Sequence, residues 1–252
     1  MPTATLNGYT HYWDDAGSGD VLVLVHGAAS AGSNLSSHFD DLSNDFRVIL
    51  PDLRGMGRSA HVESIPASAW TDDLLALLDH LSIDHAHLYG GSLGARVVLR
   101  FAIDHPERVE SLILDAPIIA NDPAGNAQLN ASFDPENLSE ERKARARGLH
   151  GDDWAAVMQN YFNIRNQPEV QEHLNLRPLC AQVTAPTLIM RGDRPDLVHP
   201  IAHSTELHEL MPNTRLAILP NTGTAIHSSA PEAMRSMIRE FISEMATVST
   251  AS

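Results

Sequence analysis

The sequence predicts an α/β protein with a mainly parallel sheet flanked by helices. Two observations predict this fold class. Short apolar runs of strand length recur along the chain and alternate with segments of helical periodicity. The apolar runs are continuous rather than alternating with polar residues, as expected of strands that are buried on both faces. In such a sheet, functional residues lie at the carboxyl ends of the strands.

The predicted elements follow one another in a regular order. The first strand is Val21–Val25, a run of valine and leucine, and the second is Phe46–Leu50, which ends at Pro51. A third strand, residues 85–89, precedes a helical stretch at 95–102. Apolar residues at helical spacing predict a further helix over residues 70–81. The remaining predicted elements are strands at 111–114, 187–190 and 215–219 and a closing helix at 231–245.

Residues 121–179 break this alternation because they contain no strand-like run. They begin with a loop-like stretch and continue as polar helical segments at 136–148 and 152–163. We therefore expect residues 1–120 and 180–252 to form the core domain. Residues 121–179 are expected to form a small helical cap insertion that covers the strand ends.

The length and net charge of the chain restrict its domain organisation and the kinds of molecule that it can bind. The chain has 252 residues, which suits one large domain or a core domain with an insertion. Its formal net charge of −15 repels phosphate backbones and anionic membrane surfaces, so we expect neither nucleic acid nor membrane as a partner. A small-molecule substrate is expected instead, and formation of a homo-oligomer is left open.

The hydropathy of the chain and the placement of its cysteine and histidines exclude several kinds of protein. No apolar run approaches the roughly 18 residues of a membrane span, and no signal peptide is visible. Cys180 is the only cysteine, which excludes an intrachain disulfide and fits the cytoplasmic localisation that we expect. The 14 histidines are scattered without a metal-binding spacing. We therefore expect no metal and no cofactor.

The most informative motif is Gly90-Gly91-Ser92-Leu93-Gly94, a Gly-x-Ser-x-Gly pentapeptide between a predicted strand and a predicted helix. A serine on such a sharp turn has a strained backbone, and the flanking glycines let strand and helix approach closely. The turn also places the serine at a helix N-terminus, where developing negative charge is favoured. The motif predicts Ser92 as a nucleophile.

Motifs along nearly the whole chain resemble those of the α/β-hydrolase superfamily and follow its order. His26-Gly27-Ala28-Ala29 is similar to the superfamily's oxyanion loop, and the Ser92 pentapeptide to its nucleophile elbow. Residues 52–59 resemble its structural turn, 192–196 the segment with the acid, and 221–231 the segment with the histidine. The resemblance implies an acyl-transfer enzyme whose oxyanion hole is formed by the backbone N–H groups of Ala28 and Leu93.

The resemblance leaves the acid among three aspartates. Asp196 lies four residues before Pro200, which is the superfamily's usual spacing, and it is the preferred acid. Asp193 is nearer to the glycine that opens the segment. Asp115 follows the predicted strand at 111–114, from which some members take the acid.

The base is where this chain departs from the superfamily's pattern. The expected histidine directly follows Gly223 and precedes Pro231 by seven residues, but that position is Thr224. A threonine hydroxyl cannot act as a general base near neutral pH. The nearest histidine is His227, which would share a face with position 224 if the loop is helical. Thr224 thus marks an inactivated variant, a member that has drifted to other chemistry, or one in which His227 has become the base.

The function expected from these residues is a serine hydrolase of the α/β-hydrolase fold that acts on a carboxylic ester or related acyl bond. Ser92 excludes the members of this fold that need an aspartate nucleophile, the haloalkane dehalogenases and epoxide hydrolases. The small insertion predicts a small to medium, largely apolar acyl substrate. The alternative is a non-hydrolytic ligand-binding or lyase-type member of the same fold.

Overall fold

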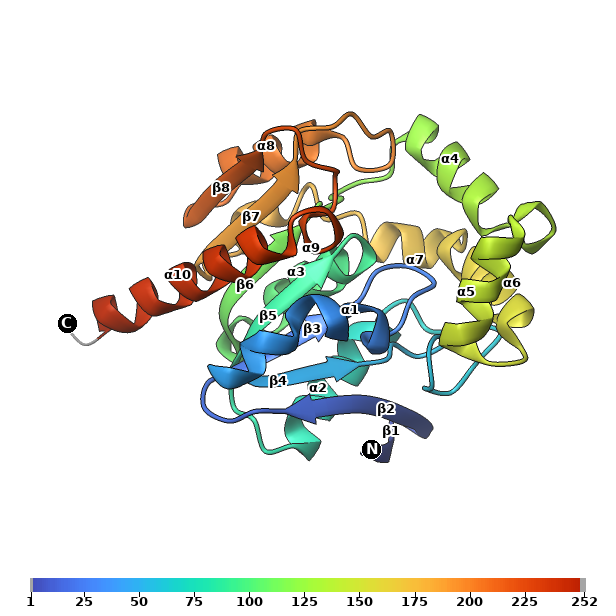
Figure 1. Cartoon of the computed structure of the whole chain (residues 1–252), viewed down its shortest axis with the longest axis horizontal. Coiled ribbons are helices and arrows are strands. Elements are labelled where there is room, and N and C mark those ends of the chain that lie inside the picture. The colour runs from blue at the N-terminus through green and yellow to red at the C-terminus, as the bar shows by residue number, and fades with distance from the viewer. Residues whose placement is uncertain (1, 250–252) are drawn as a thin grey trace.

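A computed structural model describes residues 2–249 of the chain. Its centre is an eight-stranded sheet in the order β1-β2-β4-β3-β5-β6-β7-β8 (Figure 1). Neighbouring strands from β4 to β8 are parallel, whereas β2 pairs antiparallel with both β1 and β4. The predicted mainly parallel α/β fold is confirmed. The strands are β1 (Thr3–Leu6), β2 (Tyr9–Ala16), β3 (Val21–Val25), β4 (Arg47–Pro51), β5 (Ala86–Gly91), β6 (Val109–Asp115), β7 (Thr187–Gly192) and β8 (Thr214–Leu219).

Helices cover both faces of the sheet. One face carries α2 (Ala69–His80), α3 (Leu93–Asp104) and α8 (Ile201–Leu210), and the other carries α1 (Gly32–Phe39), α9 (Ile226–Ser229) and α10 (Pro231–Ser249) (Figure 1). Short 3-10 helices complete the connections: η1 (Asp40–Asn44), η2 (Pro106–Arg108), η3 (Pro135–Asn137) and η4 (Cys180–Gln182).

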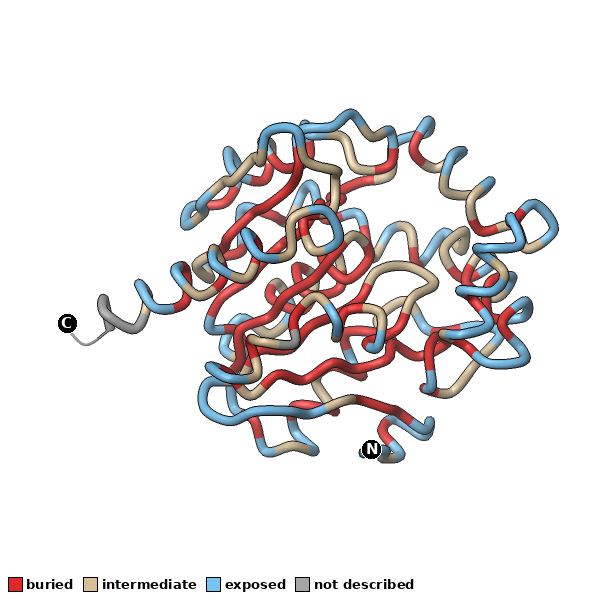
Figure 2. Tube along the Cα trace, in the orientation of Figure 1, coloured by how far each residue is buried: buried red, intermediate tan, exposed pale blue. Residues whose placement is uncertain are grey.

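The central strands are apolar throughout because they contribute to two cores. Successive side chains of a strand point to opposite faces of the sheet. In β3, Val23 and Val25 therefore belong to the core under α2 and α3, whereas Leu22 and Leu24 belong to the core under α1 and α10. Figure 2 shows the same buried character along the neighbouring strands.

The hairpin β1–β2 lies at one edge of the sheet. It was not predicted, since the first strand expected from the sequence is Val21–Val25. Its turn is Asn7-Gly8, with φ of 51° and 83°, and Leu6 pairs with Tyr9 across it. Two positive φ values are the requirement of a type I′ hairpin turn, which favours Asn-Gly. The hairpin lacks the continuous apolar runs of the central strands because half of an edge strand faces water.

Four helices lie between β6 and β7. They are α4 (Pro123–Phe133), α5 (Glu140–His150), α6 (Trp154–Arg165) and α7 (Pro168–His173). The side chain of Asp122 caps α4 through the backbone N–H of Ala124, and Ser139 caps α5 through that of Arg142. Figure 1 shows α4, α5 and α6 beyond the ends toward which β3 and β4 point. That residues 121–179 form a separate cap domain stays a prediction.

No helix within residues 2–249 is both long enough and apolar enough to cross a membrane. In the same part of the chain, no three histidine, cysteine, aspartate or glutamate side chains are grouped so that they could hold a metal ion.

Candidate active site

Ser92 occupies a strained turn between β5 and α3. Its φ is 54° and its ψ is −111°, a conformation that side-chain-bearing residues rarely adopt. A Cβ at Gly90 would lie 2.4 Å from the carbonyl of Gly94, and one at Gly94 would lie 2.1 Å from the carbonyl oxygen of Val25. Both positions therefore require glycine so that α3 can start directly against the ends of β3 and β5.

The hydroxyl of Ser92 contacts a histidine that the sequence analysis does not single out. Ser92 Oγ lies 2.8 Å from Nε2 of His199, in the loop after β7. The other ring nitrogen, Nδ1, lies 3.2 Å from Oδ2 of Asp196. The three side chains form a continuous chain from carboxylate to imidazole to hydroxyl. This is the arrangement in which a carboxylate orients a base and the base accepts the hydroxyl proton.

Asp196 is held by its own loop. Its Oδ1 accepts the backbone N–H groups of Val198, at 2.7 Å, and His199, at 3.1 Å. The hydrogen bond with the His199 ring, together with these two backbone bonds, keeps the pKa of Asp196 well below its usual range, although partial burial acts in the opposite direction. Asp196 is therefore ionised at neutral pH and favours the His199 tautomer whose Nδ1 carries the proton.

A second aspartate–histidine pair lies in the same region. Asp115, at the end of β6, is fully buried, and its Oδ2 lies 2.7 Å from Nδ1 of His227. The carboxylate also accepts the backbone N–H groups of Ile226 and His227, at 2.9 and 3.0 Å, and the hydroxyl of Tyr89, at 2.9 Å. Asp115 thus caps the first turn of α9 and anchors His227 to the sheet. In the described part of the chain, no hydrogen bond joins His227 to Ser92.

The other two predicted positions, Thr224 and Asp193, lie in the loops beside β7. The carbonyl of Thr224 accepts the N–H of Gly192 at 3.1 Å, which ties the loop after β8 to the end of β7. Asp193 is exposed, and its Oδ1 accepts the N–H of Thr222 at 3.2 Å. Neither side chain is hydrogen-bonded to an imidazole in the described structure.

Two cavities meet at Ser92. The larger, called here the outer cavity, has a volume of about 350 Å³ and is bordered by Ser92, His199 and His227 on the core side. Helices α4 to α6 and the loop before α5 supply its far wall, which includes Leu129, Phe133, Leu138, Ala146, Leu149 and Met158. The smaller, called here the inner cavity, has a volume of about 30 Å³. It shares Ala28, Ser92 and Leu129 with the outer cavity and is also bordered by Leu93.

Comparison with family models identifies the family of the chain. The model of the alpha/beta hydrolase fold matches residues 20–146, from the residue before β3 into α5. This chain belongs to the alpha/beta hydrolase family.

Relatives of this alpha/beta hydrolase carry hydrolase names. It is 26% identical to RutD of Caulobacter sp. (strain K31), provisionally named a carbamate hydrolase, over 96% of this chain and 98% of that protein. It is 25% identical to a 2-hydroxy-6-oxo-6-phenylhexa-2,4-dienoate hydrolase of Burkholderia cepacia over 86% of each chain. The solved structure of a thermophilic esterase from Thermogutta terrifontis has a TM-score of 0.74 and 22% identity, covering 97% of this chain and 98% of that one.

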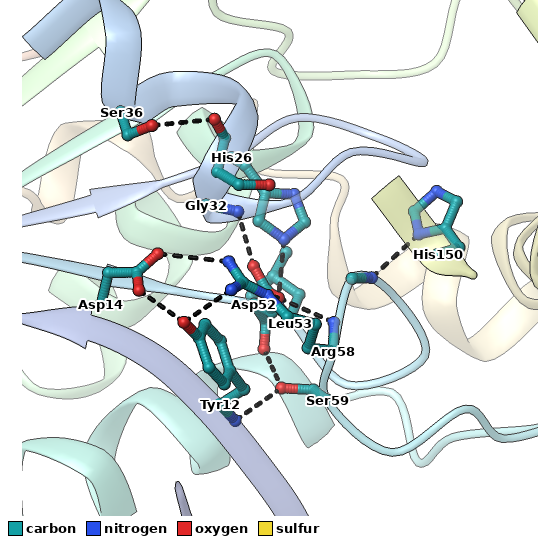
Figure 3. A network of polar contacts seen from close by, with 12 residues as sticks. Tyr12, Asp14, His26, Gly32, Ser36, Asp52, Leu53, Arg58, Ser59 and His150 are labelled. Atoms are coloured by element: carbon teal, nitrogen blue, oxygen red, sulfur yellow. Dashed lines mark hydrogen bonds and ion pairs between the residues drawn. The ribbon is translucent and has the colours of Figure 1, made fainter. Parts of the chain in front are cut away.

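In this alpha/beta hydrolase, a buried polar network supports the loop that bears Ala28 (Figure 3). Asp52 accepts the backbone N–H of Gly32 at 2.6 Å and that of Arg58 at 2.7 Å. His26 Nε2 accepts the N–H of Leu53 at 3.0 Å. Burial lowers the pKa of His26, so its ring stays neutral and keeps this acceptor. Residues 52–59 therefore hold in place the loop that lies next to Ser92.

Proposed function

We propose that the protein hydrolyses a carboxylic ester or related acyl bond of a small molecule, with Ser92 as nucleophile, His199 as base and Asp196 as the carboxylate that orients it. The observation that supports this assignment is the 2.8 Å contact between Ser92 Oγ and His199 Nε2, with Asp196 on the opposite side of the ring. On this proposal Thr224 does not disable the enzyme, because the base comes from the loop after β7.

The first half of the reaction forms an acyl-enzyme. His199 Nε2 accepts the proton of Ser92 Oγ as the oxygen attacks the acyl carbon. The carbonyl oxygen becomes an oxyanion, and the backbone N–H groups of Ala28 and Leu93 are the proposed donors to it. The imidazolium formed at His199 faces the ionised Asp196. When the tetrahedral intermediate collapses, His199 returns the proton to the leaving alcohol.

The second half of the reaction releases the carboxylic acid product. His199 Nε2 takes a proton from a water molecule, whose oxygen attacks the acyl carbon of the ester on Ser92. The new oxyanion occupies the same two donors. Collapse of this intermediate expels Ser92 Oγ, which regains its proton from His199. The net reaction consumes one water and yields a carboxylic acid and an alcohol.

The outer cavity supports a small organic substrate. Its volume of about 350 Å³ lies in the range of small-molecule sites, and its far wall is mostly apolar. The wall comes from residues 129–158, which supports a cap role for the predicted insertion. The relatives named as hydrolases support the same reaction class.

The test combines active-site labelling with turnover of a short p-nitrophenyl ester. The unaltered chain is expected to react with a fluorophosphonate probe, and Ser92→Ala is expected to abolish both labelling and turnover. His199→Gln should lower kcat by about 10³-fold, corresponding to about 4 kcal/mol of transition-state stabilisation. Asp196→Asn should also lower kcat strongly, since the ring loses its orienting anion.

Two matched controls separate this assignment from its competitors. Asp193→Asn and His208→Gln change exposed residues of the same types and should leave turnover within about twofold of the unaltered chain. His227→Gln should cost less than tenfold. A large loss with His227→Gln and a small one with His199→Gln would assign the base to the Asp115 pair instead. Absence of labelling in the unaltered chain would favour a ligand-binding protein without turnover.

A further inference from the structure

The inner cavity contains positive charge that the proposed chemistry does not use. Arg96 enters it from the first turns of α3, and Arg165 enters it from the end of α6. Asn121 and Gln171 add polar groups, and Trp70 and Leu174 are among its apolar neighbours. The inner cavity is thus a small, mainly apolar compartment that contains two cationic side chains and borders the proposed nucleophile.

Arg96 has no hydrogen-bond partner for two of its nitrogens. Its Nε and Nη2 atoms are buried and unpaired, although the residue as a whole is only partly buried because it borders the cavity. No carboxylate in the described part of the chain forms an ion pair with Arg96 or with Arg165. Arg165 donates instead to the neutral side chains of Asn126, at 2.9 Å, and Asn130.

The guanidinium of Arg96 nevertheless stays protonated at neutral pH. Burial lowers the pKa of Arg96 to about 10, and nearby Arg165 acts in the same direction, against the effect of Tyr161. A pKa near 10 leaves the guanidinium protonated at neutral pH. Burying a charge and leaving N–H donors unpaired both cost free energy, which an anionic ligand group would recover.

The ligand group that fits is a carboxylate. A guanidinium binds the two oxygens of a carboxylate through parallel N–H bonds. The inner cavity, at about 30 Å³, has room for a small group but not for a ring system. Arg96 follows Ser92 by four residues, in the first turns of α3, and both residues border the inner cavity.

We propose that the inner cavity binds a terminal carboxylate on the acyl half of the substrate, so that the substrate is a half-ester of a short dicarboxylic acid. The acyl half is assigned to this cavity because Leu93, one of the two proposed oxyanion donors, borders the inner cavity and not the outer one, whereas Ala28 borders both. The proposal rests on the serine-hydrolase function above and refines it. The substrate is then not wholly apolar, since its chain ends in an anion.

A binding experiment tests the subsite without requiring catalysis. Isothermal titration of the Ser92→Ala protein with monomethyl glutarate and with methyl pentanoate compares two esters of equal acyl chain length, of which only the first carries a carboxylate. Monomethyl glutarate should bind about tenfold more tightly or better, as expected of charged hydrogen bonds. Arg96→Gln in the same background should remove that preference. Arg100→Gln, one turn further along α3, should retain it, because Arg100 is paired with Asp104.

A kinetic experiment tests the same subsite during turnover. Acid release is followed by titration at constant pH with monomethyl glutarate and with methyl pentanoate. The unaltered chain should prefer the half-ester in kcat/KM by about tenfold or more. Arg96→Gln should collapse the ratio of the two kcat/KM values toward one, whereas Arg100→Gln should leave the ratio as it is.

The outcomes separate the two proposals. If Ser92 is labelled and both methyl esters are cleaved without preference, while monomethyl glutarate binds the Ser92→Ala protein no better than methyl pentanoate, the carboxylate subsite is overturned and the hydrolase function stands. If monomethyl glutarate is preferred in binding but no ester is cleaved and Ser92 is not labelled, the subsite stands and the hydrolase function fails. The comparison of the two esters needs no variant of Arg96, so it decides the question even if Arg96→Gln does not fold.

Discussion

We predict that acid destabilises this protein through His150, by an amount that follows from the surroundings of its side chain. His150, the last residue of α5, is buried, and its Nδ1 accepts the backbone N–H of Gly57 at 2.9 Å (Figure 3). Its Nε2 lies 3.3 Å from the carbonyl oxygen of Ala29, to which it donates in the neutral ring. Protonation of Nδ1 would remove the acceptor for Gly57. The neutral ring therefore joins α5 to the turn at residues 52–59.

The difference between the pKa of His150 in the unfolded chain and in the folded chain determines the sign and the magnitude of its effect on the free energy of unfolding. Burial lowers the pKa of His150 from 6.5 to about 4 in the folded chain. As the pH falls below 6.5, the unfolded chain binds a proton that the folded chain does not, so the free energy of unfolding decreases. The loss begins near pH 6.5 and is complete near pH 4, where it reaches about 3 kcal/mol. At pH 5 it amounts to about 2 kcal/mol.

Urea unfolding followed by far-ultraviolet circular dichroism at pH 7.5 and pH 5 measures this contribution. The comparison is between the unaltered chain and His150→Asn, whose side-chain oxygen can still accept the N–H of Gly57. The decrease in stability between the two pH values should be smaller in the variant by about 2 kcal/mol. The titration of buried histidines that do not interact with His150, such as His87, is the same in both proteins and cancels in the comparison.

The control is His208→Asn at an exposed position of α8, which should keep the full pH dependence of the unaltered chain. If His150→Asn and the unaltered chain lose the same stability between pH 7.5 and pH 5, His150 is protonated in the folded state, and its role as a neutral acceptor is refuted.

Two further predictions concern the loops around Ser92. Thr224→His should change ester turnover by less than about threefold, because the hydroxyl of Ser92 already contacts the ring of His199. A hundredfold rise in kcat/KM would instead assign the base to position 224. Gly94→Ala should lower stability by about 3 kcal/mol or more in urea unfolding, because its Cβ would collide with the carbonyl oxygen of Val25. Gly148→Ala, with open space around its Cβ, is the matched control and should be neutral or slightly stabilising. Equal free energies of unfolding for the two variants would contradict the close packing between Gly94 and Val25.

The local sequence was sufficient for the features that depend on neighbouring residues. Continuous apolar runs such as Val21–Val25 predicted strands buried on both faces, and the sheet confirms them. The spacing of Gly90 and Gly94 around Ser92 predicted a close strand–helix turn, since the glycine requirement at each position arises within one short segment. The Asn7-Gly8 dipeptide is typical of a type I′ hairpin turn. The hairpin was not predicted, because its edge strands lack a continuous apolar run.

The assignment of the base depended on the fold. Motif spacing directed attention to Thr224 and His227, because the superfamily's histidine follows the last strand. His199 was visible only as a residue three positions after Asp196. Its contact with Ser92 joins residues 107 positions apart, and it exists because β5 and β7 end at the same edge of the sheet.

By itself the sequence determined the α/β architecture and the elbow at Ser92, because both follow from interactions between residues close together in the chain. Only the tertiary structure decided which imidazole contacts Ser92, which of Asp196 and Asp115 each histidine faces, and that Arg96 has unpaired nitrogens in a cavity that Ser92 also borders. Side-chain partners across a sheet depend on where parallel strands end and on which loops those ends bring together. No local pattern specifies that convergence.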